Sequence, residues 1–281
     1  MEFTSADGER HYAALVRAAD DLVVCLDFDG TLAPIVEDPE SAHIHPDGPE
    51  VLVALAEQVR AVAVVTGRPA RQVLDLGGLE EVGTEIGEHG RELFVLGQYG
   101  NERWTSVDRR VISPAPPRGL ATLTGALPRL LREADASQAW VEEKGLAVAV
   151  HTRRLDDPEA AYDRLLPLLT DSARSHGLDV EPGKQVVEVR APGMHKGAAV
   201  RRLVDRVGAR AVLFGGDDLG DVEAFSAVEE LRGEGLAGLL VCSASEEQNA
   251  LAERADVVVD GPEGVLELLR QLTEDVRSSR V

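Results

Sequence analysis

One stretch decides the fold of this chain: Leu22-Val23-Val24-Cys25-Leu26-Asp27-Phe28-Asp29-Gly30-Thr31-Leu32. A short apolar run that is rich in valine and stops at acids and a glycine predicts a fully buried parallel strand. Because side chains alternate along an extended backbone, Asp27 and Asp29 can face one side while Phe28 turns into the core. A plain turn built from Asp and Gly would explain the motif in isolation. The other strand ends decide between the two interpretations.

Two further apolar runs also end in polar side chains. Residues 61–65 lead into Thr66-Gly67-Arg68, and residues 211–214 lead into Asp217-Asp218-Leu219-Gly220-Asp221 after two glycines. A parallel sheet brings such strand ends to one edge, where open α/β folds bind ligands. Five carboxylates in one crevice require cations to neutralise them. An oxygen-rich site of this kind suits Mg²⁺, a hard ion that pairs with phosphate.

The order of the expected elements changes in the middle of the chain. Residues 108–191 begin with a proline-rich segment and then follow the order helix, strand, strand, helix, strand, strand, whereas the flanks alternate strands and helices. We therefore expect an α/β core over residues 1–107 and 192–281, with an inserted α+β domain over 108–191. We also expect a strand around Ile86, a helix near 246–253, and a frayed end over 276–281.

Composition excludes several classes of partner. The formal net charge is −21 over 281 residues, which disfavours nucleic acid and anionic membranes because both attract cationic proteins. The chain has no apolar segment of membrane-spanning length and no signal-like start, so we expect a cytoplasmic protein. Cys25 and Cys242 lie in apolar runs and are expected to act as small hydrophobic residues.

Lysine is rare in this chain. Of the 29 basic residues, only Lys144, Lys184 and Lys196 are lysines. A compact ammonium and a planar guanidinium are not interchangeable, so these positions are candidates for a specific role.

Four motifs in a fixed order resemble those of the haloacid dehalogenase-like phosphohydrolases. They are Asp-Phe-Asp-Gly-Thr-Leu from Asp27, Thr-Gly-Arg from Thr66, Lys196, and Gly-Asp-Asp-x-x-Asp from Gly216. Further segments are similar to trehalose-6-phosphate phosphatases, namely Glu142-Glu143-Lys144-Gly145, His151-Thr152-Arg153, Glu188-Val189-Arg190 and Lys196-Gly197. The resemblance runs from Val23 to Val259 and implies a Rossmann-like core with an inserted cap that recognises the substrate.

The resemblance also implies roles for the core motifs. Asp27 would be the nucleophile that attacks phosphorus, and Asp29 the general acid and then the base for water. Thr66 and Lys196 would stabilise the phosphoryl oxygens. The expected metal ligands are Asp27, Asp29 through its backbone carbonyl, and Asp217, with Asp218 and Asp221 holding metal-bound water or orienting Lys196.

The expected activity is the Mg²⁺-dependent hydrolysis of trehalose 6-phosphate, with a functional link to a trehalose-6-phosphate synthase. The expected substrate contacts are Arg68, Glu142, Lys144 and Glu188. For Glu142 and Lys144, a solvated ion pair on an outer strand face is the alternative interpretation. Two alternative functions remain. One is a phosphatase for another sugar phosphate, such as sucrose phosphate or glycosyl-3-phosphoglycerate, and the other is a sugar-sensing module without turnover.

Overall fold

The computed structural model describes residues 2–36, 38–244 and 249–280. It divides the chain into two compact units, residues 1–113 with 195–281, and residues 114–194. The second unit corresponds to the segment in which the expected order of elements changes. Its role as a cap is a prediction that the fold alone does not test.

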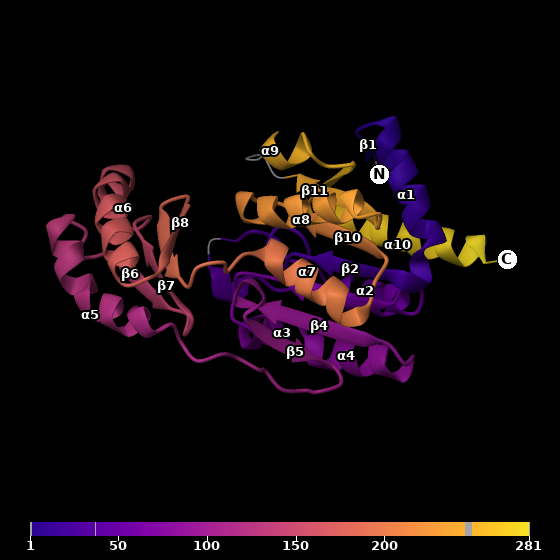
Figure 1. The fold of residues 1–281 in the computed structure, drawn as a ribbon, viewed down its shortest axis with the longest axis horizontal. Coiled ribbons are helices and arrows are strands. Elements are labelled where there is room, and N and C mark those ends of the chain that lie inside the picture. The colour runs from indigo at the N-terminus through magenta and orange to yellow at the C-terminus, as the bar shows by residue number, and fades with distance from the viewer. Residues whose placement is uncertain (1, 37, 245–248, 281) are drawn as a thin grey trace. The chain divides into compact units, whose positions relative to one another are not determined.

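The first unit is built on an eight-stranded sheet with the order β1-β12-β11-β10-β2-β3-β4-β5 (Figure 1). Its strands are β1 (Glu2–Phe3), β2 (Leu22–Leu26), β3 (Ala61–Val65), β4 (Glu92–Gly97), β5 (Glu102–Thr105), β10 (Ala211–Gly216), β11 (Ala237–Ala244) and β12 (Val257–Asp260). The six inner strands are parallel, and only the edge strands β1 and β5 pair in the antiparallel sense. The expected α/β class with a parallel sheet is confirmed.

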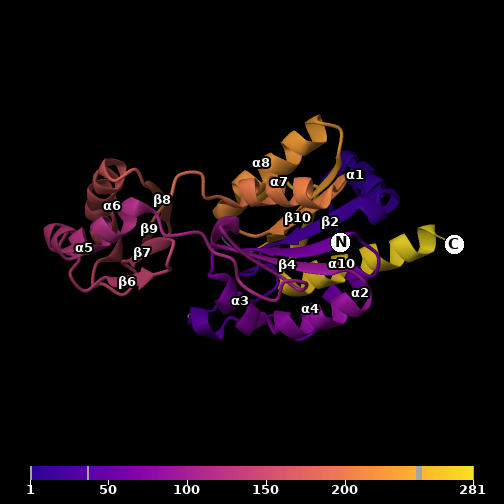
Figure 2. The same cartoon turned by 60° about the horizontal axis from the view of Figure 1, so that its bottom comes forward.

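Helices cover both faces of this sheet (Figure 2). They are α1 (Ala6–Arg17), α2 (Gly48–Ala56), α3 (Ala70–Gly77), α4 (Leu79–Glu88), α7 (Lys196–Val207), α8 (Val222–Gly233), α9 (Asn249–Ala252) and α10 (Gly261–Ser279). In β2, Val24 and Leu26 pack into the core beneath α1, α2 and α10, whereas Val23 and Cys25 pack beneath α7 and α8. Both faces of β2 are therefore buried, which is why the strand reads as an unbroken apolar run.

Strand β2 occupies the position where the chain changes direction across the sheet. It pairs with β3 on one side and with β10 on the other, in parallel register. The helices after β2 and after β10 lie on opposite faces, so the carboxyl end of β2 is a topological switch point. Phe28 follows this end and is fully buried in the core, as expected.

Two expectations about local structure are wrong. Ile86 lies in α4 and not in a strand, because Leu79, Val82 and Ile86 follow helical spacing and share one buried face. Gly83 interrupts this pattern, and a Cβ there would come within 2.9 Å of the Trp104 ring. The end of the chain is also not frayed up to residue 280, since α10 continues to Ser279 and Arg280 contacts Gln58. Part of the expected helix near 246–253 lies outside the described residues.

The second unit is a four-stranded antiparallel sheet with two helices. The strands β6 (Trp140–Glu143), β7 (Ala147–His151), β8 (Asp179–Gly183) and β9 (Val186–Arg190) have the order β6-β7-β9-β8. The helices α5 (Arg118–Glu133) and α6 (Pro158–Ser175) pack with the valines of β7 and β9 into a separate core. One face of the sheet is apolar and the other carries charged side chains, as the alternation along a strand requires.

No helix among the described residues is long and apolar enough to span a membrane. Both cysteines are free and buried, so their expected role as small hydrophobic residues is confirmed.

Asp256 connects the start of the chain to the sheet. Its carboxylate accepts a hydrogen bond from the Leu240 backbone N–H at 2.8 Å, pairs with Arg232, and contacts His11 Nδ1 at 2.9 Å. We expect Asp256→Ala to lower the free energy of unfolding by about 3 kcal/mol, because it leaves buried donors without an acceptor. Chemical denaturation measures this change. The control Asp20→Ala, at an exposed ion pair with Arg280, should cost less than about 1 kcal/mol. Equal effects of the two variants would contradict the prediction.

Candidate active site

Three neighbouring strand ends bring the sequence motifs of the first unit together. Asp27 follows β2, Thr66 follows β3 and Asp217 follows β10, and all three are buried. Lys196 is the first residue of α7, and its Nζ lies 2.7 Å from Asp27 Oδ1 and 2.7 Å from Asp221 Oδ1. The lysine side chain therefore joins the first and the last acidic motif.

The carboxylates of Asp27, Asp217 and Asp221 form a group that could hold a metal ion. One carboxylate oxygen from each residue lies within 4.8 Å of those from the other two, and all three residues are buried. One ammonium faces three acids, so two negative charges remain uncompensated if all the acids are ionised. A divalent cation would balance them, and hard carboxylate oxygens are suitable ligands.

Two glycines leave the space that this group occupies. Gly30 has a φ of +70°, and a Cβ at this position would come within 2.1 Å of Asp217 Oδ2. A Cβ on Gly216 would come within 2.4 Å of the Asp221 carboxylate. A side chain at either position would displace an acid, so the glycines of both motifs are needed for packing at the site.

Burial and mutual repulsion change the proton affinities of the acids. Burial, followed by the charges of Asp218 and Asp221, raises the pKa of Asp217 to about 8. Burial raises the pKa of Asp221 to about 6 in spite of Lys196, and it also raises the pKa of Asp27. Burial alone would lower the pKa of Lys196, but Asp221 and Asp27 outweigh it and hold this pKa well above its usual value. The lysine therefore stays charged at neutral pH.

Asp29 lies at the same strand end but has a different partner. Its two carboxylate oxygens accept hydrogen bonds from Arg68 Nη2 and Nε, each at 2.7 Å, and Arg68 also donates to the Pro39 carbonyl at 2.7 Å. The Thr66 hydroxyl accepts a bond from the Arg68 backbone N–H at 3.1 Å, which leaves its own proton available to a ligand. The side chain of Asp29 is thus not part of the three-acid group.

Asp218 is exposed and caps the short 3₁₀ helix Leu219–Asp221. Its Oδ1 accepts from the Gly220 N–H at 2.9 Å, and Asp221 Oδ2 accepts from the Asp217 and Asp218 N–H groups in return. This capping box points the Asp221 carboxylate inward, toward Lys196. Asp218 itself contributes no oxygen to the three-acid group.

The expected sugar contacts lie in the second unit, where they form a network of their own. Lys144 Nζ is 2.6 Å from Glu188 Oε2 and 4.0 Å from Glu142 Oε2, and His151 Nε2 is 2.9 Å from the same Glu142 oxygen. Glu188 is only 5% exposed. The network is only partly buried, so both interpretations of Glu142 and Lys144 stay predictions.

Sequence reasoning assigned no role to two polar residues that support these groups. Arg190 donates to Glu181 at 2.7 Å and lies 3.6 Å from Glu188 Oε1, across the charged face of the sheet. Ser243 donates to the Gly30 carbonyl at 2.6 Å and so holds the turn after β2. The alternation of Glu188 and Arg190 along β9 could have indicated the first. The second joins residues 213 positions apart, and no local pattern predicts it.

The comparisons with known proteins agree with this geometry. A family model described as trehalose-phosphatase matches residues 25–259. The chain belongs to the trehalose-phosphatase family. The expected resemblance is confirmed, and the match includes all four core motifs of the first unit and the whole second unit.

Individual relatives support the trehalose-phosphatase family and the fold. A probable trehalose-phosphate phosphatase of Sinorhizobium fredii is 30% identical over 241 residues, which cover 82% of each chain. The solved C-terminal domain of Candida albicans trehalose-6-phosphate phosphatase has a TM-score of 0.75, with 18% identity over 97% of this chain and 98% of that one. A haloacid dehalogenase-like hydrolase from Bacteroides thetaiotaomicron, at 17% identity, has a TM-score of 0.61 over 90% of this chain and 99% of its own.

The chain spans only part of some relatives. An uncharacterized glycosyl hydrolase of Mycobacterium tuberculosis is 32% identical over 264 residues, which are 91% of this chain but 18% of that protein.

The raised pKa of Asp217 predicts how the stability of the metal-free protein depends on pH. The folded protein holds this proton up to pH about 8, whereas the unfolded chain releases it near the ordinary value of 3.8. The folded state thus binds more protons within this window, and the free energy of unfolding should fall as pH rises through it. Denaturant titrations of wild type and Asp217→Asn, which cannot titrate at this position, isolate the contribution.

We expect the variant to lose less stability than wild type between pH about 5 and pH about 8. Adding a divalent cation should recover more stability in wild type at the upper end of this range, since the ion competes with the proton. Parallel pH profiles for wild type and variant would show that Asp217 does not carry the effect.

Proposed function

We propose that this chain is a Mg²⁺-dependent phosphatase that hydrolyses trehalose 6-phosphate to trehalose and phosphate through an aspartyl-phosphate intermediate. The buried group of Asp27, Asp217 and Asp221 around Lys196 carries this proposal. The match to the trehalose-phosphatase family and the Sinorhizobium fredii relative support the choice of substrate.

The donor set fits Mg²⁺. Asp27 and Asp217 would bind the ion through carboxylate oxygens, with Asp221 beside them and the Asp29 backbone carbonyl as a further ligand. Asp218 would act through water. When bound, Mg²⁺ would neutralise charge on the transferred phosphoryl group, and it would favour the ionised form of the acids whose pKa burial raises.

The protein groups then have separate tasks. An Asp27 carboxylate oxygen forms the new bond to phosphorus while the bond from phosphorus to the sugar oxygen breaks. Lys196 holds Asp27 in position at 2.7 Å and faces the phosphoryl oxygens as a permanent charge. The Thr66 hydroxyl donates to one of those oxygens. Water then attacks phosphorus and loses a proton to Asp29, the bond from phosphorus to the Asp27 oxygen breaks, and phosphate and the free Asp27 carboxylate result.

Asp29 would give a proton to the leaving sugar oxygen and later take one from the attacking water. Its carboxylate is held by both arms of Arg68, so it enters the reaction from a defined position. Arg68 would also supply a cation for the substrate phosphate, since a guanidinium binds oxyanions with two parallel donors.

The second unit would recognise the sugar. Glu142, Lys144 and Glu188 present carboxylate and ammonium groups along one sheet face, and these groups suit sugar hydroxyls, which both donate and accept hydrogen bonds. In this proposal residues 108–191 act as the cap domain on a core of residues 1–107 and 192–281.

Trehalose 6-phosphate would be supplied by a synthase, and a relative from Thermoproteus tenax is a bifunctional trehalose-6-phosphate synthase/phosphatase. Phosphate release across a panel of sugar phosphates tests the substrate. We expect the highest kcat/KM with trehalose 6-phosphate. Faster hydrolysis of sucrose phosphate or a glycosyl phosphoglycerate would replace this assignment within the same fold, and no release from any member would favour a sugar-sensing module.

Asp27→Asn should abolish turnover, because an amide of nearly the same shape cannot attack phosphorus. We expect phosphate release to fall by roughly 10³-fold or more, while circular dichroism shows an intact fold. The matched control Asp20→Asn changes an exposed acid outside the site and should keep wild-type activity. Turnover by Asp27→Asn close to the wild-type rate would exclude the covalent mechanism.

Variants of the second unit separate sugar recognition from chemistry. Each of the variants Glu142→Ala, Lys144→Ala and Glu188→Ala should lower kcat/KM for trehalose 6-phosphate. The expected loss of transition-state binding free energy is about 1–3 kcal/mol, because a buried partner is left unpaired. Hydrolysis of an aryl phosphate, which has no sugar hydroxyls, should stay near wild type. The ratio of the two rates in one preparation is the measured quantity.

The control for these variants is Glu143→Ala. Glu143 lies in the same strand as Glu142 but is exposed and points to the opposite face. This variant should leave both rates unchanged. If the three test variants depress both substrates equally, their residues are structural and do not read the sugar.

A further inference from the structure

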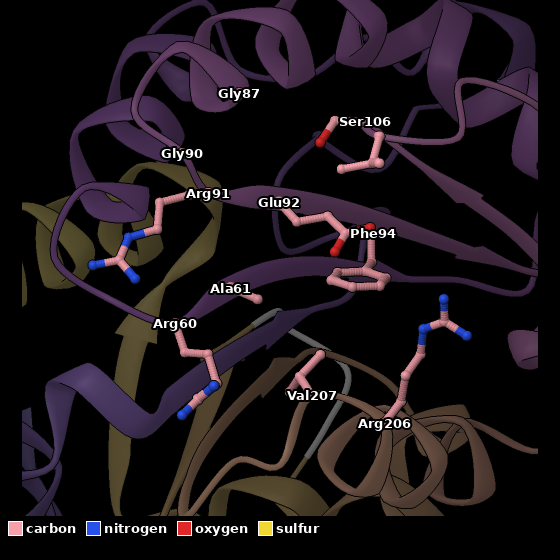
Figure 3. A pocket seen from close by; sticks show the side chains of 11 residues that line it. Arg60, Ala61, Gly87, Gly90, Arg91, Glu92, Phe94, Ser106, Arg206 and Val207 are labelled. Atoms are coloured by element: carbon pink, nitrogen blue, oxygen red, sulfur yellow. The ribbon is translucent and has the colours of Figure 1, made fainter.

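A second concave site lies in the first unit, away from the acidic group. It is a cavity of about 650 Å³ lined by parts of β3, β4, the segment after β5 and the end of α7. Figure 3 shows Arg60 and Arg91 on one side of this cavity, Arg206 on the other, and Glu92 and Phe94 between them. We call it the arginine pocket. Its volume is within the range of pockets that bind small molecules.

The arginine pocket lies at the amino-terminal ends of β3 and β4, whereas the candidate active site lies at the carboxyl-terminal ends of the parallel strands. Arg60 precedes the first residue of β3 and Glu92 is the first residue of β4, whereas Thr66 follows the last residue of β3. At roughly 3.3 Å per residue, the length of β3 separates the two edges by about 17 Å. A molecule in the pocket would therefore not reach the nucleophile.

The arginines of this pocket keep unused donors. Among the described residues, the side chains of Arg91 and Arg206 make no hydrogen bond or ion pair. Arg60 Nη2 donates a hydrogen bond to Asp21 Oδ1 at 2.7 Å, but Arg60 Nε is buried and has no hydrogen-bond partner among the described residues. By contrast, Arg201 on the same helix as Arg206 pairs with two glutamates.

The charge of the pocket is opposite to that of the chain. Three arginines line the pocket together with Glu92, and Asp21 pairs with one of them, Arg60, so a positive excess remains here in a protein of net charge −21. Arg206 lies in the last turn of α7, where the negative end of the helix dipole favours a cation. This interaction leaves the hydrogen-bond donors of the guanidinium available. The lining is thus a local site for an anion.

A phosphate monoester matches this lining better than a simple ion. It carries close to two negative charges at neutral pH, and guanidinium groups bind its oxygens with paired donors. The cavity is larger than one phosphate group. Phe94 and Val107, which is 71% exposed, provide apolar surface for an organic portion. We propose that the arginine pocket binds a phosphorylated small molecule at a site separate from the catalytic one.

Isothermal titration of the metal-free protein with inorganic phosphate and with AMP tests this proposal. Adenosine, which lacks the phosphate, is the negative control. The test variant combines Arg91→Ala with Arg206→Ala. We expect its affinity for AMP to be about tenfold or more lower than that of wild type. Both arginines lie at the surface, so thermal unfolding of the variant should match wild type.

The matched control combines Arg17→Ala with Arg110→Ala. Arg17 also lies in the last turn of a helix, and Arg110 is an exposed arginine in the same unit. This control should keep the wild-type affinity for AMP. Equal affinity of the two variants, or no binding of either phosphate or AMP to wild type, would overturn the proposal and leave Arg206 as a helix-end cation only. Because binding is measured without turnover, this result is independent of the proposed catalytic activity.

Discussion

The ion pairs of Lys196 with Asp27 and Asp221 are the interaction on which the arrangement of the site depends. Removing three carboxylates from water costs several kcal/mol for each charge, and one buried ammonium offsets only part of that cost. The remaining excess appears as the raised pKa values of Asp217 and Asp221. The acidic group therefore lowers the stability of the metal-free protein, and its charge suits a cation together with a phosphoryl group.

The sheet makes this concentration of charge possible. Strand β2 pairs with β3 and β10 in parallel, so their carboxyl ends meet at one edge. The helix after β2 and the helix after β10 lie on opposite faces of the sheet, which makes this edge a topological switch point. Gly30 and Gly216 then leave space for Asp217 and Asp221 beside Asp27. Apolar packing along the whole strands holds the polar ends, and the opposite ends of β3 and β4 frame the arginine pocket.

Sequence alone was sufficient for the layers of the fold and for the sheet edge at which the acids meet. The unbroken apolar runs of β2, β3 and β10 predict a sheet buried on both faces, and their endings predict which residues meet at its edge. Lys144 and Lys196, which the scarcity of lysine singled out, pair with acids. The same reasoning failed at Ile86, where glycines break up the helical pattern of α4.

Only the tertiary structure decided how the charges are paired. The sequence does not distinguish Asp29 and Asp218 from the other acids. In the structure, Asp29 pairs with Arg68, and Asp218 caps the 3₁₀ helix Leu219–Asp221. In the part of the chain that the structure describes, the side chains of Arg91 and Arg206 make no hydrogen bond or ion pair, whereas Arg201 on the same helix as Arg206 pairs with two glutamates. The sequence predicts which helix or strand carries a given residue, because the hydrophobic periodicity that marks these elements is a local property of the chain. Pairing depends on distances of a few ångströms between segments far apart in the chain, which packing alone sets.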